Sequence, residues 1–132
     1  MSNSKLKCGD SRFAAMLLFQ FRVVTDGVAN RRRLCERRLL VLEALSGRDA
    51  LKKAKRRGRK SEHHYANSRG GQVFFEFVGV LDLLNLGPEC EDGEVWYQLC
   101  ELLEPRERQD QLIPAEETLQ AIAEGSRYSK KA

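Results

Sequence analysis

The amino-acid sequence predicts an α+β fold: a four-stranded, mainly antiparallel sheet with one basic helix packed on a face and a short C-terminal helix. Two observations predict this class. Four segments show the period-two alternation or the apolar and β-branched enrichment typical of strands: 12–25, 33–45, 72–84 and 94–103. One helical segment, 47–62, lies between the second and third of them, where a helix can lie across the sheet.

The chain length of 132 residues suits one continuous hydrophobic core better than two small ones. Its hydrophobic residues, 42% of the chain, occur in runs, which argues against wholesale disorder. We therefore expect a single α+β domain over 12–125. A disordered or extended N-terminal segment, 1–11, would precede it, and a basic C-terminal tail, 126–132, would follow it.

The first two predicted strands should form a hairpin. Every second residue from Phe13 to Val23 is apolar, so one face of the first strand would be buried. Asp26-Gly27 opens a turn, and the second strand then returns beside the first. Residues 31–33, three consecutive arginines, would lie at the end of that second strand or in the loop before it.

The predicted helix has a distinct beginning and a thin apolar edge. Ser46 is a suitable N-cap, and Asp49 three residues later completes a variant of the capping box. Small residues recur at every fourth position, at Ala50, Ala54 and Gly58, which would let the helix approach a sheet closely. The rest of its surface is almost entirely basic.

The later elements are less regular. The third predicted strand is apolar on both faces apart from Glu76 and Asp82, so we expect both of its sides to be covered at least in part. The fourth strand would end at Pro105. A short C-terminal helix would begin near Pro114 and end at Gly125. Its buried stripe would comprise Ala115, Leu119, Ile122 and Ala123.

Charge is strongly segregated along the chain, although the net charge is only +4. Residues 31–60 contain thirteen Lys and Arg against three acids, a net +10. Residues 82–124 contain twelve acids against two Arg, a net −10. Two interpretations are open: the basic block is a face for nucleic acid or another polyanion, or the two blocks neutralise each other within the fold or across a dimer.

Three motifs follow one another in a recognisable order. They are the helix with Ala50, Ala54 and Gly58, the strand Phe77-Val78-Gly79-Val80-Leu81-Asp82, and the turn Asp92-Gly93-Glu94-Val95. Over roughly 13–103 they resemble a small bacterial domain family of unknown function with a β-β-α-β-β layout. The resemblance implies the α+β fold and attaches no biochemical activity to it. The strongly basic helix departs from the family's pattern.

The sequence offers few parts for catalysis or metal binding. It has no GxSxG, P-loop, GxGxxG or HExxH pattern, and its cysteines form no CxxC pair. His63 and His64 are adjacent and are expected to be solvent-exposed helix-exit or loop residues; on a strand they would point to opposite faces. Glu76 and Asp82 would lie about 20 Å apart, too far for one acid/base pair, and would instead pair with Arg37, Arg38 or helix cations, or face water. We expect no enzyme activity, no catalytic residue, no cofactor and no metal.

We therefore expect a non-catalytic protein-interaction domain that binds a protein partner or forms a homodimer through its complementary charged faces. The alternative is nonspecific binding of nucleic acid or another polyanion through the basic helix. The candidate polyanion-binding or partner-binding residues are Arg31, Arg32, Arg33, Lys52, Lys53, Lys55, Arg56, Arg57, Arg59 and Lys60. The candidate interface anchors are Trp96, Tyr97, Leu102 and Leu103.

The sequence predicts neither a membrane span nor an export signal. Its longest apolar run, Phe13 to Phe21, is far shorter than the roughly 18 to 20 residues that cross a bilayer. Its N-terminus does not have the order of a signal peptide. We expect no membrane partner and a cytoplasmic location, in which the thiols stay reduced.

Overall fold

A computed structural model describes residues 11–87 and 94–129. Most of the expected N-terminal segment, the Asp92-Gly93 turn and the last three residues of the expected basic tail lie outside the described residues. The chain divides into two compact units, Met1–Tyr97 and Gln98–Ala132, which are described separately. We call the first the sheet unit.

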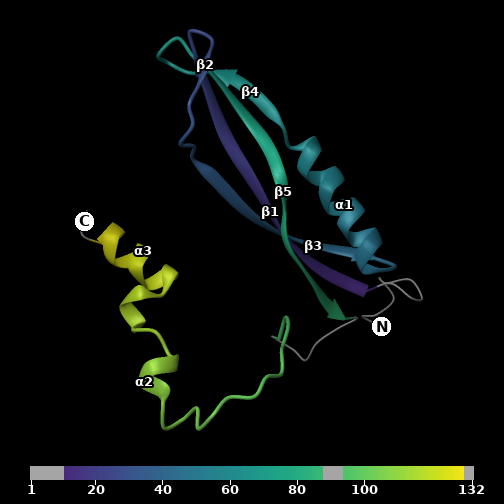
Figure 1. The fold of residues 1–132 in the computed structure, drawn as a ribbon, viewed down its shortest axis with the longest axis vertical. Coiled ribbons are helices and arrows are strands. Elements are labelled where there is room, and N and C mark those ends of the chain that lie inside the picture. The colour runs from purple at the N-terminus through teal and green to yellow at the C-terminus, as the bar shows by residue number, and fades with distance from the viewer. Residues whose placement is uncertain (1–10, 88–93, 130–132) are drawn as a thin grey trace. The chain divides into compact units, whose positions relative to one another are not determined.

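The sheet unit confirms the α+β fold class, with five strands where the sequence predicts four (Figure 1). The elements in chain order are β1 (Ser11–Thr25), β2 (Val28–Ala29), β3 (Cys35–Ala44), α1 (Gly47–Lys60), β4 (His63–Ala66) and β5 (Gln72–Gly87). All strand pairs are antiparallel. β1 is central, because it pairs with β5 on one side and with both β3 and β2 on the other.

The two long strands β1 and β5 pair along almost their whole length, from Arg12↔Gly87 to Val24↔Gln72. The register shifts three times, and each shift inserts an unpaired residue into β5. Such bulges increase the local twist and bend the strand. Two of the inserted residues, Val78 and Leu81, are about half exposed, at 53% and 50%.

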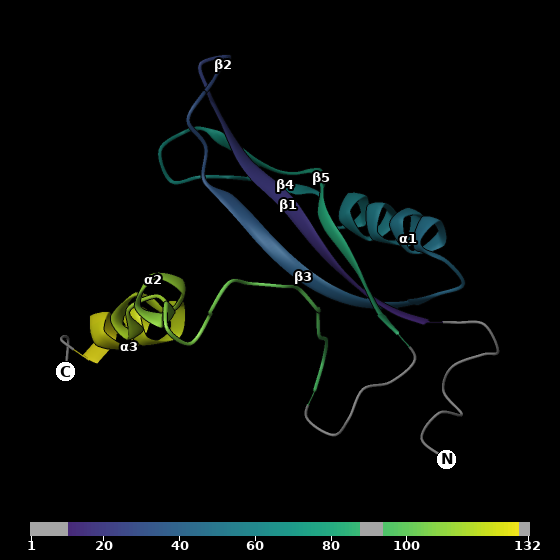
Figure 2. The ribbon, with the colours of Figure 1, turned by 60° about the horizontal axis from the view of Figure 1, so that its bottom comes forward.

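The hydrophobic core lies between α1 and one face of the sheet (Figure 2). Phe19 at its centre is fully buried, and its ring stacks on that of Phe75 with centroids 4.7 Å apart. α1 contributes only small side chains, because Ala50 and Ala54 are fully buried while the cations of the helix point outward. The other buried members of the core are Phe13, Ala15, Leu17, Leu42 and Ala44.

The predicted close approach of helix and sheet is confirmed at Gly58. A Cβ atom at this position would lie only 2.7 Å from Cγ of Phe77, well inside van der Waals contact. The predicted helix start is also confirmed, because Oγ of Ser46 accepts a hydrogen bond of 3.1 Å from the backbone N–H of Asp49. The Asp49 carboxylate in turn accepts from the N–H of Leu45 at 3.2 Å.

The prediction of a strand over 94–103 is wrong, since the described residues there have no strand or helix. Alternating apolar side chains do not suffice for a strand, because its backbone groups need a neighbouring strand as hydrogen-bond partner. His63 and His64 were expected to be solvent-exposed helix-exit or loop residues; both are exposed, but they lie in β4, opposite Phe75 and Phe74 of β5. β2, only two residues long, was not predicted.

The second unit contains α2 (Gln109–Leu112), a 3-10 turn (Glu116–Thr118) and α3 (Gln120–Ser129). The predicted C-terminal helix is therefore confirmed, but it begins after the 3-10 turn and continues through Gly125 instead of ending there. The predicted burial of its stripe is wrong for Leu119 and Ile122, which are 45% and 46% exposed. Among the described helices, none has the length and apolar character needed to cross a membrane.

Candidate functional site

The outer surface of α1 carries the strongest charge in the sheet unit. We call it the α1 cationic face and define it as Lys52, Lys53, Lys55, Arg56, Arg57, Arg59 and Lys60. Six of these side chains are exposed, and only Lys53 is half-buried. The positions follow from the sequence, because the small residues of α1 occupy the side that packs on the sheet.

Lys53 differs from the other cations of this face because its ammonium group already interacts with neighbouring groups of the protein. Its Nζ donates a 2.8 Å hydrogen bond to the backbone oxygen of Glu43 and lies 3.6 Å from the carboxylate of Asp49. Within the described part of the sheet unit, the other six cations form no ion pair. Within that part of the chain, no acidic side chain neutralises their charges.

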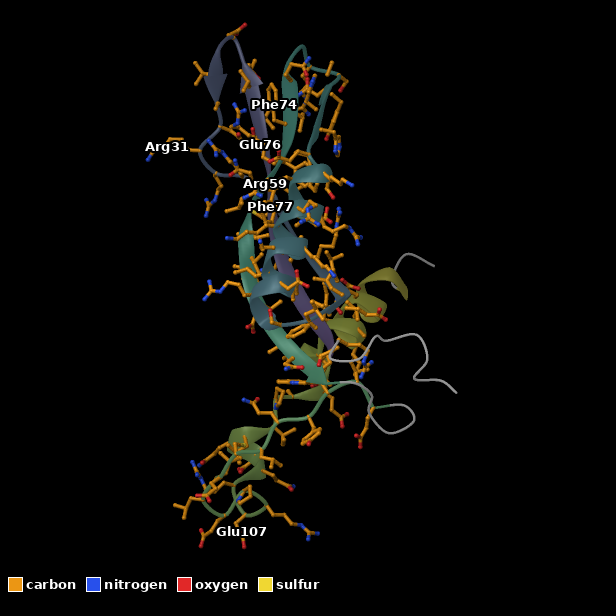
Figure 3. All side chains as sticks on the ribbon, turned by 90° about the vertical axis from the view of Figure 1, so that its right-hand side faces the viewer. Arg31, Arg59, Phe74, Glu76, Phe77 and Glu107 are labelled. Atoms are coloured by element: carbon orange, nitrogen blue, oxygen red, sulfur yellow. The ribbon has the colours of Figure 1, made fainter. Side chains whose placement is uncertain are left out.

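The three consecutive arginines lie apart from the α1 cationic face. They belong to the connection between β2 and β3, where Arg31 and Arg32 are exposed (Figure 3). Arg33 donates from Nε to the backbone oxygen of Asn30 at 2.7 Å and from Nη1 to Oε1 of Gln20 at 3.1 Å. Gln20 follows the buried Phe19 in β1 and therefore points to the sheet face opposite α1. Arg33 thus binds at the opposite face from the helix cations.

A second surface lies on the side of the sheet opposite α1. We call it the back face and define it as Ala14, Met16, Leu18, Leu39, Val41, Leu81 and Leu84, with Arg37 and Asp82 at its sides. Leu39 and Val41 are both 60% exposed. Part of the surface is hollowed, with a volume of about 290 Å³ lined by Met16, Leu39 and Leu84 among others.

The sequence analysis did not identify the back face as a surface. A signal for it was present: the strands have apolar residues on both sides, but only one amphipathic helix is available within 12–97 to cover them. Both sides of the third strand were expected to be covered at least in part. Within the described sheet unit, Leu81 on β5 is 50% exposed on the side opposite α1.

A polar cluster occupies the end of the same sheet face near β4. Arg22 binds the carboxylate of Glu76 in bidentate fashion, at 2.9 Å from Nε and 2.7 Å from Nη2, and Gln20 donates to it at 2.9 Å. The guanidinium of Arg22 also lies 4.5 Å above the ring of Phe74. The expected pairing of Glu76 with Arg37, Arg38 or a helix cation is wrong.

These contacts fix the ionisation of Glu76. The hydrogen bonds from Arg22 lower the pKa of the carboxyl to about 2, against a smaller opposing effect of partial burial. The group is therefore ionised at every physiological pH, and its oxygens already accept from Arg22 and Gln20. Such a carboxylate is a poor general acid or base, since it has little tendency to take up a proton.

The sequence from residue 12 to residue 97 shows to which family the chain belongs. The model of a domain of unknown function, DUF4288, matches residues 12–97, which is more than half of the chain. The chain belongs to this family. The resemblance to a small family of unknown function is thereby confirmed. No curated protein and no solved structure matches the chain significantly.

The DUF4288 domain contains both histidines of the chain. The ring of His63 lies 5.1 Å from that of Phe75, and the ring of His64 lies 5.5 Å from that of Phe74, so the two point to opposite faces of β4. Among the described residues, no three His, Cys, Asp or Glu side chains are grouped in a way that could hold a metal ion. Cys35 and Cys100 are both exposed free thiols.

The candidate interface anchors fall on both sides of the boundary between the two units. Trp96 and Tyr97, the last residues of the DUF4288 match, border a hollow of about 420 Å³ together with the end of β5. Leu102 and Leu103 belong to the second unit and are 57% and 73% exposed.

Proposed function

We propose that this DUF4288 domain is a non-catalytic interaction domain whose α1 cationic face binds an acidic protein surface. The observation that carries the proposal is the set of six exposed cations on α1 that have no acidic partner within the described sheet unit. Opposite charge on a partner would speed encounter and fix the orientation of the complex.

The rigidity of the helix supports this function. Ala50, Ala54 and Gly58 seat α1 directly on the sheet, and Ser46 caps its first turn. With a rise of about 1.5 Å per residue, the cations from Lys52 to Lys60 form a pre-ordered array about 12 Å long. Binding then requires ordering of side-chain ends only, with no change in the backbone.

Nonspecific nucleic-acid binding is the second candidate, and the density of cations on α1 favours it. Six cations along one helix that form no ion pair within the described sheet unit could neutralise several phosphates. The same helix has no Asn or Gln to read base edges, and no aromatic side chain on which a base could stack. A nucleic acid would therefore be bound through its backbone, without sequence preference.

Titration with two defined polyanions separates these candidates. Labelled polyglutamate and a labelled DNA duplex are each titrated with the full chain at about 50 mM and about 200 mM salt. We expect polyglutamate to bind with an affinity that falls as salt rises, and duplex to bind more weakly. Tighter binding of duplex would favour the second candidate, and no binding of either at low salt would rule out both.

Charge-reversal variants then locate the binding surface. Arg56→Glu combined with Arg59→Glu should reduce polyglutamate affinity at least about tenfold, because both side chains lie exposed on α1. Arg31→Glu combined with Arg32→Glu is the matched control, since it changes the net charge equally on a different element. Equal losses in the two variants would mean that net charge, and not the α1 cationic face, governs binding.

The acidic block 82–124 of a second copy would be one such acidic surface, as the charge blocks of the sequence suggest. Self-association of this kind depends on exposed charges and would weaken strongly as salt screens them. Sedimentation of the full chain at low and high salt measures it directly. A salt-sensitive oligomer that the Arg56→Glu and Arg59→Glu changes disrupt would identify this arrangement.

A further inference from the structure

The back face is a large apolar surface that the sheet unit leaves open. α1 covers the opposite face, and no described residue of the sheet unit covers Leu39, Val41 or Leu81, which are 50 to 60% exposed. These three side chains come from β3 and β5, on either side of the central strand β1. Together with Met16 and Leu18 of β1 they form one continuous patch, a feature that commonly marks a protein contact surface.

Two charges flank this patch on opposite sides. In the register of the sheet, Arg37 of β3 lies beside Leu18 of β1, and Asp82 of β5 lies beside Met16. The two charged residues are therefore on opposite sides of β1 and about 7 Å apart along it. Neither forms an ion pair within the described residues of the sheet unit. The Asp82 carboxylate accepts only a local hydrogen bond, of 2.8 Å, from the N–H of Leu83.

This placement of charge is self-complementary. A two-fold axis parallel to β1 exchanges the two sides of the sheet, so β3 of one copy comes to lie over β5 of the other. Arg37 of each copy then faces Asp82 of the other, while Met16 and Leu18 near the axis meet their own counterparts. The length of an arginine side chain can span the remaining offset of about 7 Å.

We propose that two copies of this chain pack their back faces together about such an axis and form a homodimer. The two sheets then form a sandwich with the ordinary spacing of about 10 Å and an angle of about 30°. The interface goes beyond the proposed function, because it uses the face opposite α1 and leaves both α1 cationic faces outside.

The remaining charges near the back face are compatible with a second copy. The polar cluster towards β4 is internally neutralised, because Arg22 and Glu76 form a bidentate pair. The patch itself carries one acid and one base, which face each other's counterparts in the two-fold arrangement. Beyond its end, Arg12 and Glu43 lie on the same face as cross-strand neighbours of opposite charge, and Arg12 also donates to the backbone oxygen of Gly87 at 3.4 Å. A second copy presents the complementary charges automatically, because the two-fold axis places Arg37 of each copy opposite Asp82 of the other. An unrelated protein would match these two charges only by coincidence.

Sedimentation of the full chain tests the dimer. We expect a species of twice the chain mass of 15.1 kDa at micromolar concentration, and we expect it to persist at about 1 M salt because the contact is mainly apolar. A chain that is monomeric at every concentration would overturn the proposal and would leave the back face to another protein. A dimer that dissociates at high salt would also overturn it, in favour of association through charged faces.

Variants identify the interface. Val41→Glu introduces a charge at an exposed position of the patch, where the monomer tolerates it, and should abolish the dimer. Arg37→Asp or Asp82→Arg alone sets like charges opposite each other at two symmetric places and should weaken dimerisation on the order of tenfold. Arg37→Asp combined with Asp82→Arg should restore it.

If the variant that combines Arg37→Asp with Asp82→Arg did not regain dimerisation, the two-fold arrangement would be overturned. Circular dichroism checks that each variant is folded. Arg56→Glu on α1 is the control, and it should leave the dimer unchanged while it weakens polyglutamate binding. Because the two surfaces are on opposite faces of the sheet, loss of one interaction does not entail loss of the other.

Discussion

At the scale of single residues, Glu76 shows how a polar group is stabilised on an otherwise apolar strand. Its carboxylate is about 29% exposed and accepts hydrogen bonds from Arg22 and Gln20 on the neighbouring strand. The strand register, in which Gln20 of β1 lies opposite Glu76 of β5, brings these groups together. Because β5 contains bulges, this register cannot be deduced from the spacing of residues in the sequence. The prediction from sequence spacing therefore paired Glu76 with Arg37 or Arg38 instead of Arg22.

The pKa of Glu76 predicts a specific acid sensitivity. Its carboxyl has a pKa of about 2 in the folded protein and an ordinary value of 4.5, so the folded state binds this proton less readily than the unfolded state. The resulting stabilisation is complete above about pH 4.5 and is lost as the pH falls towards about 2. The Glu76→Gln variant should therefore be less stable than the unaltered protein near neutral pH. The difference in free energy of unfolding should shrink as the pH falls towards about 2.

Urea unfolding at a series of pH values measures this difference. Glu43→Gln is the matched control, because Glu43 is an exposed acid on β3 whose carboxylate makes no ion pair within the described sheet unit. A constant stability difference between Glu76→Gln and the unaltered protein from neutral pH to about pH 2 would contradict the assigned role of the pair.

At the scale of elements, the seating of α1 determines where the cationic face lies. Gly58 faces Phe77, and the helix can approach this ring only because position 58 has no Cβ atom. Gly58→Ala should destabilise the fold by about 1 to 3 kcal/mol, because overpacking outweighs the better helix propensity of alanine. Chemical denaturation measures the change, and Lys55→Ala, at an exposed position of the same helix, should be nearly neutral.

A second variant separates this contact from a general effect on the helix. In a Phe77→Leu background the clash is relieved, so Gly58→Ala should cost less there than in the unaltered protein. The same cost in both backgrounds would show that Phe77 is not what limits the approach of α1.

The elements that the sequence could predict are those whose signals are local. β1 has a sustained alternation, and α1 has a capping residue at Ser46 and small residues at a helical period, so both were placed within two residues of their observed ends. β4 and β2 are short and exist only because a neighbouring strand pairs with them. The converse holds for 94–103, where apolar residues are frequent but the described residues form no strand.

Prediction of the candidate site from the sequence has the same limit, because local patterns are predictable and tertiary contacts are not. The cations of α1 could be assigned to an outer face from the helical period, and the structure places them there. Whether Arg33 joins them depends on a tertiary contact with Gln20, which no local pattern encodes. The back face could be suspected only by counting apolar strand faces against the helices available to cover them.

At the scale of the whole molecule, the stability of the chain resides in the sheet unit. Every buried hydrophobic residue of the described chain lies between Phe13 and Leu86, whereas no described side chain from Gln98 to Glu124 is buried. The DUF4288 match ends at Tyr97, where the compact sheet unit also ends. Through Glu124, the second unit therefore contributes charge and short helices but no buried side chain.

The single domain that the sequence predicts over 12–125 stays a prediction, and a fragment tests it. A chain that ends at Tyr97 should fold cooperatively and melt within a few degrees of the full chain, because removal of the second unit takes away no buried side chain through Glu124. Calorimetry of the fragment and of the full chain provides the comparison. Loss of a cooperative transition in the fragment would mean that residues after Tyr97 complete the core, and that the chain folds as one domain over its whole length.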